Sequence, residues 1–142
     1  MKTFGILGGL GPMATAYLLQ RIIDITDAKN DQDHADVIVF NRPSIPDRTA
    51  YILDANKQSP IPALINTAKE LEKIGACAIG IPCVTAHSFY DEISSAVDIP
   101  IINMVKETAK QIAKENRKKA DILATSGTIH TGLFRLHFRR WE

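Results

Sequence analysis

The sequence predicts an α/β fold in which a parallel sheet is flanked by helices on both faces. Short apolar runs rich in β-branched residues alternate five times with longer stretches of helical periodicity, which is the pattern of repeated βα units. Runs such as residues 37–40 show no polar alternation, which is typical of strands that are covered on both sides. A chain of 142 residues has the length of one ordinary domain, or of one domain and part of another.

The expected elements follow in order along the chain. Strands are expected over residues 3–7, 37–40, 77–81, 99–102 and 121–125. Helices are expected over residues 12–28, 63–74, 85–96 and 105–116, with a short helix around 49–56 inside a proline-rich loop over 41–62. Pro12 suits a first helical turn, and Gly75 suits the end of a helix. In the first helix an apolar face is expected from Tyr17, Leu18, Ile22 and Ile25.

This alternation divides the chain into residues 1–102, a first α/β domain that carries Cys83, and residues 103–142, the incomplete start of a second α/β domain. Only ten residues follow Gly132, too few for a full helix and a further strand. An interrupted second domain leaves a sheet edge and apolar helix faces uncovered. We therefore expect the chain to associate, as a homodimer.

Composition excludes several classes of protein. A net charge of +1 provides no electrostatic footprint for nucleic acid. No apolar run approaches the ~20 residues that span a bilayer, and no secretory signal opens the chain, so we expect no membrane partner and a cytoplasmic location. Cys77 and Cys83, six positions apart, suit neither a disulfide scaffold nor a zinc site, and no metal is expected.

The loop after the first strand, residues 8–15 (Gly-Gly-Leu-Gly-Pro-Met-Ala-Thr), is the first candidate ligand segment. Its glycines let the backbone approach a ligand, and the helix that follows offers free N–H groups. It formally matches the dinucleotide pattern G-x-G-x-x-A, but Asn41 and Arg42 stand where that fold needs an acidic residue. A nucleotide site is therefore disfavoured, and a plain tight turn remains the alternative.

The second candidate segment is residues 82–87 (Pro-Cys-Val-Thr-Ala-His). Cys83 lies where the third strand ends and a helix is expected to begin, where the helix dipole favours a thiolate. His87 follows one helical turn later, either as a catalytic group or as a structural residue. Cys77 lies inside the strand and fits a small buried apolar residue.

Two further segments add polar groups. Residues 125–128 (Thr-Ser-Gly-Thr) follow the expected fifth strand and could bind a carboxylate or an amine, or only cap a helix. In the long loop, Arg48 could hold a carboxylate through two hydrogen bonds or could simply be solvated.

Four segments in this order resemble the aspartate/glutamate racemase family: residues 8–15, 45–49 (Ile-Pro-Asp-Arg-Thr), 82–87 and 123–128 (Leu-Ala-Thr-Ser-Gly-Thr). The resemblance extends from residue 1 to about residue 133. It implies two similar α/β domains facing a cleft, inversion at the α-carbon of acidic amino acids without pyridoxal phosphate or another cofactor, and one catalytic cysteine from each domain.

The resemblance also implies roles for individual residues. Cys83 matches the first catalytic thiol. The implied substrate-binding residues are Gly9, Leu10, Arg48, Val84, Thr85 and Thr125, and Thr15, His87 and Thr128 are further possible site residues.

Two departures from the family pattern weaken the catalytic expectation. Val84 replaces the asparagine that usually follows the first cysteine, and no cysteine follows Cys83, so the second thiol of a Gly-Cys-Thr-Glu segment is absent. We expect racemisation by this chain to be severely impaired, unless another chain or a different acid such as His87 serves the opposite face. The alternatives are a truncated or degenerate protein that binds small acids without catalysis, and a flavodoxin-like domain that binds phosphate or nucleotide.

Overall fold

A computed structural model describes residues 2–115 and 119–138. Along the chain its elements are β1 (Thr3–Gly8), α1 (Pro12–Ile25), η1 (Asp31–Asp33), β2 (Val37–Asn41), α2 (Arg48–Leu53), α3 (Ile61–Lys73), β3 (Ala76–Gly80), η2 (Thr85–Phe89), α4 (Tyr90–Ser94), β4 (Ile101–Ile102), α5 (Met104–Lys114), α6 (Ser126–Thr131) and α7 (Leu133–Phe138), where η denotes a 3-10 helix. Up to α5, strands and helices follow one another in the order that the sequence predicts.

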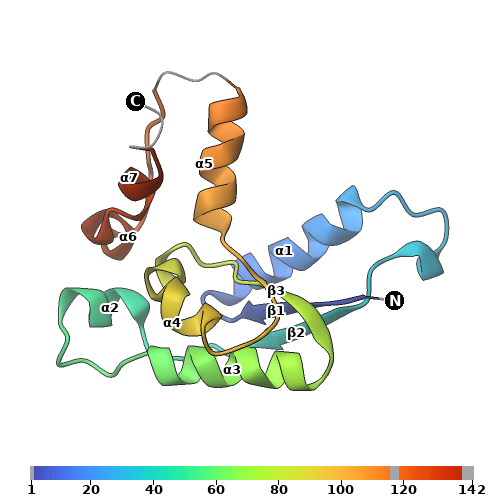
Figure 1. Cartoon of the computed structure of the whole chain (residues 1–142), viewed down its shortest axis with the longest axis horizontal. Helices are drawn as coiled ribbons and strands as arrows, with labels where there is room; N and C mark the ends of the chain where they lie inside the picture. The colour runs from blue at the N-terminus through green and yellow to red at the C-terminus, as the bar shows by residue number, and fades with distance from the viewer. Residues whose placement is uncertain (1, 116–118, 139–142) are drawn as a thin grey trace.

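The four strands form one parallel sheet in the order β2-β1-β3-β4, which confirms the predicted fold class. From β1 the chain crosses to β2 on one side, and from β2 it crosses back over β1 to β3. Right-handed crossovers in opposite directions place α1 and α3 on opposite faces of the sheet, as Figure 1 shows. The carboxyl ends of β1 and β3 therefore border a topological switch point, where ligands bind in such sheets.

The two faces of the sheet are covered unequally. On one face α3 buries Leu64, Ala68 and Leu71 against the strands. On the other face only Thr15 of α1 is buried, and Tyr17 and Ile25 of its expected apolar face are 66% and 70% exposed. The expected burial of that helix face is therefore wrong for these two residues, because no described element covers them.

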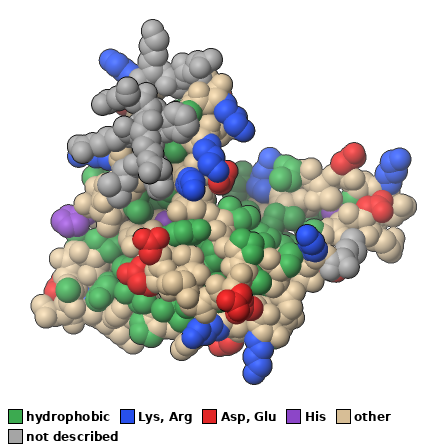
Figure 2. All heavy atoms as spheres, viewed as in Figure 1, with side chains coloured by type: hydrophobic (Ala, Val, Ile, Leu, Met, Phe, Trp, Pro, Cys, Tyr) green, Lys and Arg blue, Asp and Glu red, His purple; other side chains and the backbone are tan. Residues whose placement is uncertain are grey.

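Apolar side chains also lie on the surface elsewhere. In Figure 2 hydrophobic side chains gather across the middle of the visible face, and acidic and basic side chains are scattered around them. A groove of about 380 Å³ runs beside α1. It lies between Tyr17 and Leu18 of that helix and Ile102 of β4 and Met104 of α5.

The fifth strand expected over residues 121–125 is absent from the structure: this segment has no strand pairing, and Leu123 is fully exposed. A strand exists only where a neighbour accepts its hydrogen bonds, and the described residues provide none for this segment. The adjoining residues form α6 and α7 instead.

The helix expected over residues 85–96 is divided into η2 and the short α4. In an α-helix the N–H of His87 would bond to the carbonyl of Cys83. That carbonyl instead lies 2.9 Å from Nδ1 of the His87 ring, and the His87 N–H bonds to Val84 at 2.9 Å. The side chain thus takes the α-helical acceptor, and the turn tightens to 3-10 geometry.

Candidate active site

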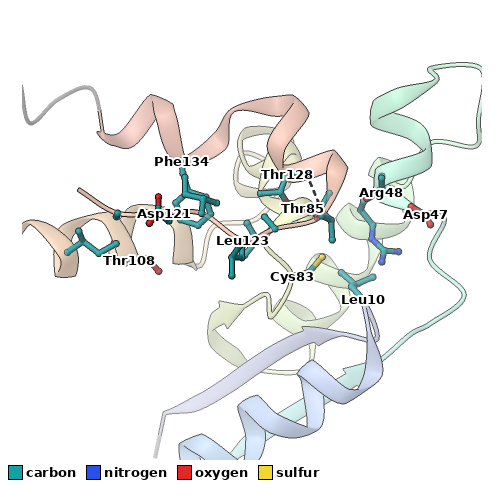
Figure 3. Close-up of a pocket in the computed structure, with 17 residues that line it drawn as sticks. Leu10, Asp47, Arg48, Cys83, Thr85, Thr108, Asp121, Leu123, Thr128 and Phe134 are labelled. Atoms are coloured by element: carbon teal, nitrogen blue, oxygen red, sulfur yellow. Dashed lines mark hydrogen bonds between the residues drawn. The ribbon is translucent and has the colours of Figure 1, made fainter. Parts of the chain in front are cut away.

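A cavity of about 620 Å³ opens at the carboxyl end of β3. Its walls come from the loops after β1 and β3, from α2 and α5, and from the chain over residues 120–134 (Figure 3). The lining residues are Leu10, Asp47, Arg48, Thr49, Cys83, Val84, Thr85, Thr108, Ile112, Ala120, Asp121, Ile122, Leu123, Ala124, Thr125, Thr128 and Phe134. This is the place where ligands are expected in a doubly wound sheet.

Cys83 lines this cavity and is partly exposed. A tight turn positions it, because its N–H donates to the carbonyl of Ile81 at 2.8 Å directly after β3. Cys77 is also a free, partly exposed cysteine, but it lies within β3 and does not line the cavity. Of the two thiols, Cys83 alone therefore faces the candidate site.

Arg48, the first residue of α2, is oriented by the backbone that precedes it. Its Nη1 donates to the carbonyls of Ile45 at 3.2 Å and Pro46 at 3.1 Å, and the Asp47 carboxylate caps α2 by accepting from the Ala50 N–H at 2.9 Å. The buried Nε has no hydrogen-bond partner among the described residues. A guanidinium that is fixed at one nitrogen in this way is prepared to bind a carboxylate with the others.

Three threonine hydroxyls form a closed set of hydrogen bonds beside Cys83. Thr85 Oγ1 lies 3.0 Å from Thr125 Oγ1 and 2.9 Å from Thr128 Oγ1, and the last two are 3.2 Å apart. Thr125 also caps α6 through the N–H of Thr128. These bonds join η2 to α6, and all three threonines line the cavity.

Gly127 allows this close approach of α6. A Cβ at that position would lie 2.8 Å from Thr49 Oγ1 of α2 and 3.1 Å from the methyl carbon of Thr85. A larger residue would therefore push α6 away from α2 and η2.

Gly9 and Thr15 support the loop after β1 and do not line the cavity themselves. Gly9 has φ +92°, and a Cβ there would overlap the backbone of Arg42. Its N–H donates to the buried Thr15 Oγ1 at 2.8 Å. Together these residues hold Leu10, which is 5% exposed, in the cavity wall.

His87 is buried outside the cavity, and both of its ring nitrogens lie against backbone groups. Nδ1 lies 2.9 Å from the Cys83 carbonyl, and the N–H of Met104 donates to Nε2 at 3.2 Å. These two bonds fit one neutral tautomer, in which Nδ1 carries the hydrogen. Burial lowers the pKa of His87 and favours this neutral form. The ring thus ties the Cys83 turn to the start of α5.

The cavity brings together most of the residues singled out in the sequence: Leu10, Arg48, Cys83, Val84, Thr85, Thr125 and Thr128. It leaves Gly9, Thr15 and His87 outside the lining. The other end is lined by Thr108, Ile112, Asp121, Leu123 and Phe134. None of these was predicted as a site residue, although Leu123 begins one of the four segments that resemble the family. Only the spacing of four between Thr108 and Ile112 hinted that they share a face of α5.

Within the described part of the chain, no cluster of three or more histidine, cysteine or acidic residues is arranged to hold a metal ion. No helix of that part is long and apolar enough to cross a membrane.

A parallel α/β sheet with a cysteine, an arginine and a hydroxyl cluster at its switch point defines the class of this protein. It is an α/β chain whose cavity brings together a thiol, a guanidinium and three hydroxyl groups. Residues 7–141 match the family model described as Asp/Glu/hydantoin racemase, and the chain belongs to that family. The resemblance found in the sequence is thereby confirmed.

Individual relatives agree with this assignment. The chain is 34% identical over 134 residues to the broad specificity amino-acid racemase RacX of Bacillus subtilis, covering 92% of this chain and 57% of RacX. Its fold matches the aspartate racemase of Picrophilus torridus with a TM-score of 0.91 at 35% identity, over 99% of this chain and 60% of that one. An aspartate racemase homologue from Pyrococcus horikoshii matches with a TM-score of 0.78 at 26% identity, over 99% of this chain and 61% of that one.

The chain therefore spans about three fifths of the length of these relatives.

Proposed function

We propose that this chain provides one half of the acid–base machinery of a cofactor-independent amino-acid racemase, with Cys83 acting at the α-carbon. The observation that supports it is the cavity itself, where Cys83, Arg48 and Thr85 line one end (Figure 3). The related proteins are named as an aspartate racemase and as a broad specificity amino-acid racemase, so their names leave the side chain of the substrate open.

In the proposed reaction the Cys83 thiolate removes the α-proton and becomes a thiol. The electron pair of the broken C–H bond delocalises into the α-carboxylate, which then carries additional negative charge. The Arg48 guanidinium and the hydroxyls of Thr85, Thr125 and Thr128 can stabilise that charge by hydrogen bonds that strengthen as it develops. Gly9 and Thr15 act indirectly by holding Leu10 in the wall, and the Val84 N–H is a further candidate contact.

Inversion also requires a proton donor on the opposite face of the α-carbon. The sequence contains two cysteines, and the other one, Cys77, lies in β3 outside the cavity. His87 is engaged with backbone at both nitrogens. We therefore propose that this chain alone exchanges the α-proton on one face and racemises poorly.

We further propose that residues 1–102 are the first domain and residues 103–142 begin the second. The cavity supports this division, because α5 and residues 120–134 form one wall and the loops of the sheet form the other. The exposed Tyr17 and Ile25 of α1 support a homodimer, which light scattering on the purified chain tests. The cytoplasmic location remains a prediction.

The central test is hydrogen exchange at the α-carbon in deuterated water, followed by proton NMR. We expect slow loss of the α-proton signal with retention of configuration, and complete loss of this exchange in Cys83→Ser. Cys77→Ser is the matched control, because it removes the other thiol and leaves the cavity unchanged. Exchange that survives Cys83→Ser unaltered would contradict the proposal.

A second candidate function is binding of a small amino acid without catalysis. It is favoured by one observation, that a single cysteine lines the cavity among the residues that the structure describes. In that case an amino acid would protect Cys83 from alkylation by iodoacetamide, and no α-proton exchange would be detected.

A further inference from the structure

The cavity has two chemically different ends. Figure 3 shows Arg48, Cys83 and Thr85 at one end, and Phe134 and Asp121 at the other. The polar end is built on the loops of the sheet and on α2. The second end is built on α5 and on the chain that follows it.

The second end is predominantly apolar. Ile112 of α5, Ile122 and Leu123 of the following segment, and Phe134 of α7 line it. Thr108 and Asp121 are the polar members of this wall. Among the described lining residues, a side chain that enters this part of the cavity meets mainly methyl groups and the ring of Phe134.

The charges of the described lining residues point the same way. Arg48 is the single cation among them, whereas Asp47 and Asp121 are both carboxylates. A dicarboxylic amino acid brings two carboxylates, and Arg48 can neutralise only one. The second carboxylate would meet no cation among the described residues that line this cavity, and it would lie near Asp121, where like charges repel each other. Arg135 of α7 lines the adjoining pocket and not this cavity.

Binding through the α-carboxylate directs the rest of the substrate along the cavity. If Arg48 holds that group and Cys83 contacts the α-carbon, the substrate side chain extends toward Leu123 and Phe134 (Figure 3). A volume of about 620 Å³ lies within the usual range for small-molecule sites, so a side chain of moderate size fits there.

We propose that this site selects amino acids with uncharged, apolar side chains of about the size of leucine or methionine, in preference to aspartate or glutamate. The inference rests on the proposed role of Cys83 and Arg48 in the same cavity. It departs from the acidic substrate that the sequence resemblance implies.

The experiment compares two pairs of side chains of similar length, leucine with aspartate and methionine with glutamate. Binding to the full chain is measured by isothermal titration calorimetry, and Cys83-dependent exchange at the α-carbon is measured by NMR. We expect at least about a tenfold preference for leucine over aspartate and for methionine over glutamate, typical of a pocket that leaves a charged group unpaired.

The outcomes separate the two proposals. Cys83-dependent exchange that is faster with aspartate than with leucine overturns the apolar preference and leaves the function of Cys83 standing. Absence of binding and exchange with all four amino acids overturns both.

A substitution in the apolar wall sharpens the test. Leu123 is fully exposed to solvent, so Leu123→Arg adds a cation at the second end without disturbing the core. We expect this variant to shift the ratio of aspartate to leucine affinity by about tenfold toward aspartate. Ile25→Arg is the matched control, since Ile25 is 70% exposed at the end of α1, away from the cavity. An unchanged ratio in Leu123→Arg, or an equal shift in both variants, contradicts the inference.

Discussion

The two walls of the cavity differ in how they are built. The sheet side rests on side chains such as Leu7, Leu71 and Ile79, which have no exposed surface. In the segment after α5, Leu123 is fully exposed and Ile129 is 53% exposed. Cys83, the proposed acid–base group, thus lies on the well-packed wall, whereas the groups that we propose to select the substrate side chain lie on the loosely covered wall. Chemistry and selectivity should therefore respond differently to mutation.

The largest effect is expected for truncation of the packed wall. Leu71→Ala should lower the free energy of unfolding by about 2–5 kcal/mol, because it leaves a cavity under the sheet. Leu123→Ala should change that free energy by less than about 0.5 kcal/mol, because the side chain has no core to leave. Urea unfolding followed by circular dichroism measures both. Equal decreases in the free energy of unfolding for the two variants would contradict the difference in packing between the two walls.

The next effect concerns the loop after β1. Gly9→Ala should lower the free energy of unfolding by about 1–3 kcal/mol, because φ +92° is unfavourable for alanine and its Cβ would overlap the Arg42 backbone. Gly11→Ala is the control, since no atom lies within 4 Å of the position that its Cβ would take. Thermal unfolding compares the two variants. A Gly9→Ala protein as stable as Gly11→Ala would show that the loop adjusts freely.

A smaller effect depends on pH and sharpens the role of His87. In the unfolded chain a histidine binds a proton near pH 6.5, whereas burial lowers the pKa of His87 in the folded protein. Its contribution to stability is therefore complete above about pH 6.5 and is lost as the pH falls toward the folded-state pKa, by roughly 1 kcal/mol per pH unit.

Urea unfolding at pH 7, 6 and 5 measures this slope. His87→Gln should be less stable at pH 7 but should lose less stability on acidification. His130→Gln, which removes an exposed histidine of α6, should keep the slope of the unmodified chain. A slope that is unaffected by His87→Gln would assign the acid sensitivity to other groups.

The smallest effect is expected at the surface. Arg42 makes two hydrogen bonds to Glu70, and its guanidinium lies 4.4 Å from the centre of the Phe40 ring. Glu70→Gln should lower the melting temperature slightly at low salt and hardly at all at 1 M salt, because screening weakens an exposed ion pair. An effect that persists in high salt would contradict this account.

Much of the fold was predictable because its signals are local. The strands around residues 3–7, 37–40 and 77–81 are confirmed within one or two residues, as is the helix that ends before Gly75, whose φ of +100° explains the glycine. The strand expected over 121–125 depended on a neighbour that the described chain does not provide. The division of the helix at 85–96 depended on a hydrogen bond from a side chain to a backbone carbonyl.

The residues of the candidate site also include some that the sequence predicted and some that it could not predict. Arg48, Cys83, Thr85 and Thr125 were found because they belong to short segments whose sequences resemble the racemase family. The structure brings these segments together at one cavity. Ile112 and Phe134 could not be found, because an apolar residue on a helix is indistinguishable in sequence from ordinary core. Their place in the cavity depends on how α5 and α7 pack against each other.

The ring of threonine hydroxyls has a thermodynamic consequence. Each hydroxyl carries one hydrogen, so Thr85, Thr125 and Thr128 together can donate the three hydrogen bonds that connect them. An anion that accepts a hydrogen bond from one of these hydroxyls breaks one of the three bonds. Two of those bonds connect α6 and its N-cap to η2. Anion binding and the packing of α6 against η2 thus compete for the same hydroxyl donors. Because such coupling is reciprocal, a change that weakens the packing of α6 also alters the affinity for the anion.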